Sequence, residues 1–155
     1  MKFGFFAAGL AAALATAAIA QEAEDPFADA VESRHGLMLL MAQNLGTLGG
    51  MAKGETPYDA AVAGKAADNI AALSSVMSMD LFPAGSEYEK AADSFALPSI
   101  WSNQEDFVKK ISALNDAANA MTADAKKDLA SLQAGMNGIG GACAACHKAY
   151  RQPEE

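Results

Sequence analysis

Residues 143–151 have the sequence Cys-Ala-Ala-Cys-His-Lys-Ala-Tyr-Arg, and the rest of the chain must be arranged around what this stretch binds. Cys-x-x-Cys-His is the attachment motif of a c-type haem. Cys143 and Cys146 can form thioethers with the two vinyl groups of the porphyrin. His147 follows directly, so its imidazole can reach the iron. The sequence therefore predicts one covalently attached haem c.

A Cys-x-x-Cys pair can also be a redox disulfide or half of a zinc site. The redox motif normally opens a helix after a strand, and no strand-like pattern precedes Cys143. A zinc site needs four ligands, whereas the chain has two cysteines and only one further histidine, His35. Haem attachment is therefore the favoured interpretation.

Residues 1–20 form a predicted secretory signal peptide. Lys2 gives the positive start, residues 3–19 are apolar and rich in alanine, and residues 18–20 (Ala-Ile-Ala) fit a cleavage site. A membrane anchor is the alternative, but the apolar run is of borderline length and alanine is weakly hydrophobic. We therefore expect cleavage, export to the periplasm of a bacterium, and a mature protein without a membrane anchor.

Removing 20 residues from 155 leaves 135, which predicts a single domain over residues 21–155. The formal net charge of −8 becomes −9, because Lys2 is lost. This acidity argues against nucleic acid and anionic lipid as partners and favours basic ones.

Four stretches have apolar residues at helical spacing, and no strand-like alternation competes with them. The first extends from Asp25-Pro26 to about Ala52, with Gly54 as its stop. The second begins at Thr56-Pro57, with Thr56 as the expected cap, and ends near Asp80. Val62 belongs to its expected inward stripe.

The third helix is expected to follow a capping box, Ser102-Asn103-Gln104-Glu105. Thr122 or Asp124 is expected to cap the fourth. The inward stripe of the fourth helix begins at Leu129 and includes both cysteines, so haem would be attached to the interior. Four glycines in this helix are costly and indicate close approach of a neighbouring helix or of the porphyrin: Gly135, Gly138, Gly140 and Gly141.

The joins between the first and second helices and between the third and fourth are short, whereas residues 80–98 form a long connection. This arrangement predicts an all-α, antiparallel four-helix bundle. The long connection is expected to contain a short helical piece at residues 88–92. Trp101 is expected to pack in the core, and the widened apolar surface at Leu37, Leu39 and Leu40 could serve a second helix or a subunit interface.

The whole mature chain resembles the class II c-type cytochromes, the cytochrome c-prime family. The landmarks are the C-terminal haem motif with Tyr150-Arg151, residues 34–38 (Arg-His-Gly-Leu-Met), residues 51–60 and residues 100–102. The resemblance implies a left-handed bundle with haem between its helices, His147 as the proximal iron ligand, and frequent homodimers. It also implies that Arg151 lies close to the proximal pocket.

The family divides on the other face of the iron, where the resemblance places Met38. In low-spin members a methionine of the first helix coordinates the iron, and the protein carries electrons. In members with a five-coordinate, high-spin haem this position holds an uncoordinated side chain, and the iron binds nitric oxide or carbon monoxide. Methionine is compatible with both, because it is a soft ligand and also a flexible core filler.

Other side chains near Met38 need a role. Arg34 lies on the inward stripe, so it needs an anion, either a haem propionate or a nearby acid. Met41 is expected to be core, His35 to be solvated rather than an iron ligand, and Lys148 to be solvated.

We expect electron transfer by a low-spin His147/Met38 haem, with redox proteins as partners. The alternative is a five-coordinate protein that binds nitric oxide or carbon monoxide. An enzyme such as a peroxidase would need a distal acid–base pair, for which only Arg34 and His35 could serve, so we expect no enzymatic activity.

Overall fold

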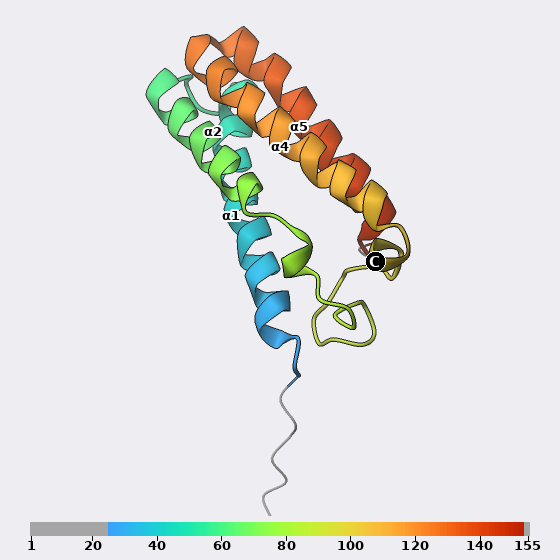
Figure 1. Cartoon of the computed structure of the whole chain (residues 1–155). Coiled ribbons are helices and arrows are strands. Elements are labelled where there is room, and N and C mark those ends of the chain that lie inside the picture. Colours follow the sequence, from blue (N-terminus) through green and yellow to red (C-terminus); the bar gives the residue numbers. More distant parts are fainter. Residues whose placement is uncertain (1–24, 154–155) are drawn as a thin grey trace, which may run out of the picture.

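Four long helices make up most of the protein in the computed structural model, which describes residues 25–153 (Figure 1). They are α1 (Ala28–Ala52), α2 (Ala60–Ser75), α4 (Gln104–Lys127) and α5 (Leu129–Tyr150). The 3-10 helix η1 (Met79–Leu81) and the short α3 (Ser99–Ser102) lie between α2 and α4. The predicted all-α four-helix fold is confirmed. The predicted signal peptide lies outside the described residues.

The ends of α1 agree with the sequence to within a few residues. The Asp25 carboxylate accepts a hydrogen bond from the Phe27 amide at 2.8 Å, although the helix itself begins at Ala28. At the other end Gly54 has φ +75°, a left-handed conformation that glycine adopts without steric cost. The predicted stop at Gly54 is therefore confirmed.

The predicted starts of the three later helices are wrong in detail. Asp59, not Thr56, caps α2, because its carboxylate accepts from the amides of Ala61 and Val62 at 2.8 and 3.0 Å. The predicted capping box at Ser102 is absent, since Ser102 is the last residue of α3 and its hydroxyl donates to the Ser99 carbonyl.

The predicted start of the fourth helix at Thr122 or Asp124 is also wrong, because α4 continues through both residues to Lys127. Asp128 caps α5 instead, accepting from the Ser131 amide at 2.7 Å. Each of these errors has the same cause. Several residues near each boundary can cap a helix, and the packing of the helices decides which one does.

The core of the bundle lies between α1, α2, α4 and α5, and small residues from α2 contribute much of it. The buried face of α2 contains Ala63, Gly64, Ala66, Ala67 and Ile70. Val62 is 47% exposed and Leu129 is 37% exposed, so the prediction that both point inward is wrong. Small buried residues let α1 and α4 approach α2 closely, and the larger valine is left outside.

Residues 76–98, hereafter the crossover segment, connect α2 to α3 and cover one end of the bundle (Figure 1). The helical piece predicted at residues 88–92 is wrong, because the chain forms turns there. Glu89 and Asp93 have φ 68° and 56°, and these left-handed conformations cannot continue a right-handed helix.

A second apolar cluster holds the crossover segment against the bundle. It contains Phe82, Ala96, Ile100, Phe107 and Tyr150. As expected, Trp101 packs in the core here: it is half-buried against this cluster, and its Nε1 donates to the carbonyl oxygen of Phe82 at 3.0 Å. Within residues 25–153, no helix has the length and apolar character needed to cross a membrane.

Candidate haem site

The C-terminal half of α5 carries the motif residues. Cys143 and Cys146 are half-buried free thiols, and His147 follows them as an exposed residue of the last helical turn. Burial raises the pKa of the Cys143 thiol. Burial, and after it the charge of Cys143, raises the pKa of Cys146 to about 11. The sulfur atoms therefore lie in surroundings of low polarity, which suit an apolar group better than a thiolate.

These residues face a hollow between α1, α4, α5 and the crossover segment. It consists of two adjoining cavities of about 510 and about 160 Å³ with mostly apolar walls. The residues that line both are His35, Met38, Met77, Phe95, Cys146, His147 and Arg151. Cys143 lines the larger cavity only.

The donor set around this hollow fits a haem c. Two free thiols separated by two residues border the hollow together with an imidazole and a thioether, and the walls are otherwise largely apolar. A large apolar ligand with a metal at its centre needs this combination. Among the described residues no cluster of three or more histidines, cysteines or acids exists that could hold a bare metal ion.

Three methionines border the hollow, and they differ in position. Met38, from α1, is half-buried and lines both cavities together with His147 of α5. Met41 is buried and lines the larger cavity only, which agrees with the core role expected for it. Met77 is buried just beyond the end of α2 and lines both cavities.

Met77 is a pocket residue that the sequence did not identify. Met77 lies at helical spacing from Ile70 and Leu73, and that spacing cannot distinguish a core residue from one that borders a cavity. Only the early end of α2 at Ser75, followed by the turn into the crossover segment, brings Met77 beside Met38 in the lining of both cavities.

Arg34 is buried, with 4% of its surface exposed, and it lines the smaller cavity. Its Nη1 donates to the carbonyl oxygen of Leu81 at 3.2 Å and to Ser86 Oγ at 2.9 Å. Its Nη2 donates to the carbonyl oxygen of Ser86 and to Ser94 Oγ, both at 2.7 Å. These four acceptors are neutral, neither of the two kinds of anion predicted for this side chain. Burial lowers the pKa of Arg34.

The remaining predicted residues lie around the rim of the hollow. Arg151 lines both cavities, and its amide donates to the His147 carbonyl at 3.0 Å. Lys148 is exposed and lines neither cavity. His35 is exposed, as expected, but it borders both cavities, with its ring centroid 5.9 Å from that of Phe95.

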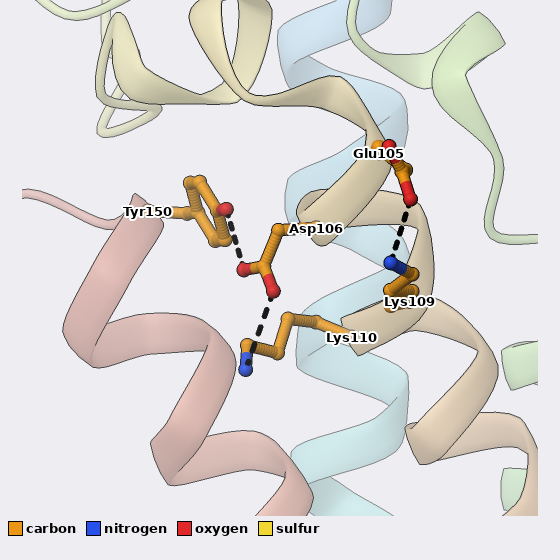
Figure 2. Close-up of polar contacts among 5 residues, drawn as sticks. All are labelled: Glu105, Asp106, Lys109, Lys110 and Tyr150. Carbon is orange, nitrogen blue, oxygen red and sulfur yellow. Dashed lines mark hydrogen bonds and ion pairs between the residues drawn. The ribbon is translucent and has the colours of Figure 1, made fainter.

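The end of α5 is fastened to α4 by a polar contact that the motif alone did not reveal. Tyr150 is buried, and its hydroxyl donates to Asp106 Oδ2 at 2.7 Å (Figure 2). The other oxygen of Asp106 lies 3.8 Å from Lys110 Nζ, and Lys110 lines the larger cavity. Burial and the Asp106 carboxylate raise the pKa of Tyr150 to about 12.

Comparisons with known proteins agree with this geometry. The family model described as Cytochrome C' matches residues 29–151. A protein named cytochrome c-554, from Cereibacter sphaeroides, is 55% identical over 91% of this chain and 92% of its own.

Two solved structures share the fold. Cytochrome c prime from Shewanella frigidimarina is 38% identical, with a TM-score of 0.75 over 82% of this chain and 97% of the other. A nitric oxide complex of a mutant cytochrome c prime from Alcaligenes xylosoxidans is 34% identical, with a TM-score of 0.72 over the same shares.

Proposed function

The chain belongs to the cytochrome c-prime family, and on that premise we propose that it is a periplasmic electron carrier whose haem iron is bound by His147 and Met38. It is a monohaem c-type cytochrome, with one haem c attached covalently at Cys143 and Cys146. When bound, this group supplies a one-electron redox centre. The chain supplies the ligands and the surroundings.

One observation carries the proposal: Met38 and His147 come from different helices and line the same two cavities. His147 offers an imidazole from α5, and Met38 offers a soft, neutral thioether from α1. Methionine and histidine together are known to raise a haem potential.

The surrounding residues support an electron carrier because they keep the site apolar and fixed. Ile111 and Leu114 of α4 and Ala142 of α5 line the larger cavity. The hydrogen bond from Tyr150 to Asp106 fixes the last turn of α5, which holds His147. Apolar and fixed surroundings reduce the rearrangement that accompanies a change of charge.

Binding of nitric oxide or carbon monoxide is the second candidate function. A related cytochrome c prime of the same fold is known as a nitric oxide complex. In this alternative Met38 packs over the iron without coordinating it. A half-buried methionine at the wall of the cavity is compatible with that role.

Carbon monoxide added to the reduced protein separates the two functions. If Met38 coordinates the iron, we expect slow and incomplete spectral conversion in the native protein and rapid, full conversion in Met38→Ala. Met51→Leu is the matched control, because Met51 is also buried on α1 and lines neither cavity, and it should behave like the native protein. Rapid, full conversion of the native protein would establish the second function instead.

We propose no enzymatic activity. A peroxidase needs a distal acid–base pair. His35 borders both cavities beside Phe95, but both Nη groups of Arg34 are bound to the crossover segment, so His35 has no second acid–base group paired with it there.

We further propose redox proteins as partners and a homodimer formed through α1. Leu40 of that helix is 48% exposed and lines neither cavity. Location in the periplasm is supported by the family's covalent haem and by the bacterial source of the named relatives.

A further inference from the structure

The buried Arg34 joins two parts of the protein that are distant in the sequence. It lies on α1 one helical turn before Met38, so both side chains are on the same side of the helix. The four hydrogen bonds of its Nη groups all end on residues 81–94 of the crossover segment. Its Cζ also lies 5.2 Å from the ring centroid of Phe82 in that segment.

Ser86 and Ser94 bind this guanidinium and also contact each other. Ser94 Oγ accepts from Arg34 Nη2 and donates to the carbonyl oxygen of Ser86 at 2.6 Å. Both serines are buried, with exposures of 0% and 4%. A planar guanidinium can hold two oxygens with each Nη group, which a lysine ammonium cannot reproduce. We call Arg34, Ser86 and Ser94 the latch.

The crossover segment is also joined to the helix that carries His147. The Leu97 amide donates to the Tyr150 carbonyl at 2.9 Å, and the Gln152 amide donates to the Phe95 carbonyl at 2.8 Å. Ala96 and Arg151 form an antiparallel bridge between these bonds. The segment is thus bound by the latch to α1 on one side and by backbone hydrogen bonds to the end of α5 on the other.

We propose that the latch positions Met38 over the iron. The reason is geometric: Met38 and His147 lie on different helices, and the crossover segment connects those helices beside the cavities that both residues line. Loss of the latch leaves α1 free to shift relative to α5 at this end. The proposal rests on the proposed function in that haem occupies these cavities, but it applies whether Met38 coordinates the iron or only covers it.

The kind of acceptor that Arg34 contacts supports a positioning role for this residue. A buried cation gains most from a carboxylate partner, yet the acceptors of the Nη groups are two serine hydroxyls and two carbonyl oxygens. Neutral acceptors fix the orientation of the Arg34 guanidinium without neutralising its charge. The four hydrogen bonds also use all four Nη hydrogens, which leaves Nε–H as the donor toward any haem propionate.

The rate of carbon monoxide binding to the reduced holoprotein tests this proposal. We expect Ser94→Ala to raise that rate on the order of tenfold, the low end of the effect of losing a hydrogen bond to a charged group. Arg34→Lys should raise it as well. Ser74→Ala is the matched control, because Ser74 is equally buried and lines neither cavity, and it should leave the rate unchanged.

A double-variant cycle shows whether the latch acts through Met38. In a Met38→Ala background, Ser94→Ala should have no further effect on the rate. An unchanged rate in Ser94→Ala, or an equal increase in both backgrounds, would overturn the proposal. The spectrum of the unmodified oxidised protein reports separately on iron ligation by Met38, so failure of the proposed function and failure of the latch are distinguishable. Far-UV circular dichroism and haem content confirm that each variant is folded and loaded.

Discussion

The phenol of Tyr150 is held in surroundings that favour its neutral form. It lies in an apolar cluster and donates to Asp106, and burial with this neighbour raises its pKa to about 12. An unfolded tyrosine has a pKa near 10. The folded protein therefore retains a proton that the unfolded chain releases, so this contribution to stability is complete below about pH 10 and is lost as pH rises toward 12.

We therefore expect Tyr150→Phe to be less sensitive to alkali than the native protein. The variant should lose about 1 kcal/mol at neutral pH with the hydrogen bond. Between pH 9 and pH 11 its melting temperature should fall less than that of the native protein. Thermal unfolding at both pH values measures this difference. An equal fall in melting temperature in the two proteins would show that Tyr150 does not contribute to alkaline unfolding.

For single residues, the sequence identified those with a distinctive chemistry, but it did not show which residues they contact. Six side chains were predicted as site residues, and the structure brings all of them to one hollow: Arg34, Met38, Cys143, Cys146, His147 and Arg151. The acceptors of Arg34 could not be predicted. They lie about 50 to 60 residues away in a segment without periodicity, so no local pattern links them to α1.

At the scale of the element, the glycines of α5 have unequal roles. A Cβ added to Gly135 would lie 2.9 Å from Met121 Cε, so a close approach of α4 explains that glycine. A Cβ added to Gly140 would meet no atom within 4 Å apart from its own helix. The sequence could indicate that these glycines were costly, but not which ones a neighbouring helix requires.

We expect Gly140→Ala to stabilise the protein by about 1 kcal/mol, because alanine has the higher helix propensity and the site is open. Gly135→Ala should gain less or lose stability, since the buried end of Met121 must move. Urea unfolding of both variants measures the difference. An equal gain in both would mean that α4 and α5 do not approach closely at Gly135.

Some helix boundaries are set by the local sequence, and others are set by the packing of the helices. The apolar spacing correctly identified four long helices, and the glycine at position 54 marked the end of the first, because both signals depend on local preferences. The caps at Asp59 and Asp128 were missed, since several residues nearby can supply an oxygen and tertiary packing selects one. Val62 was misplaced for a related reason: α2 buries its alanines.

At the scale of the whole molecule, the exposed apolar residues of α1 predict self-association. Leu40 is 48% exposed on α1, and Val108 is also 48% exposed on α4. If a dimer forms through α1, Leu40→Glu should shift the protein to monomer in sedimentation velocity. Val108→Glu adds the same charge at equal exposure and should leave the dimer intact. A native protein that sediments as a monomer at high concentration would contradict this interface.

The bundle architecture was predictable from the chain because each helix has its own apolar stripe and the joins are short or long in a recognisable order. The arrangement of the crossover segment was not. Its contacts with Arg34 and with Tyr150–Gln152 join residues from three parts of the chain, and turns at Glu89 and Asp93 set its course. Such long-range contacts follow from the assembled fold and have no periodic signature.

The absorption spectrum of the oxidised protein shows whether Met38 of α1 and His147 of α5 are the two iron ligands. With both ligands in place, we expect a low-spin spectrum with the weak long-wavelength band of methionine-ligated haem. That band should persist in Met77→Leu, which alters the other methionine lining both cavities, and disappear in Met38→Ala. A high-spin spectrum in the native protein, or a band that survives in Met38→Ala, would show that Met38 does not coordinate the iron.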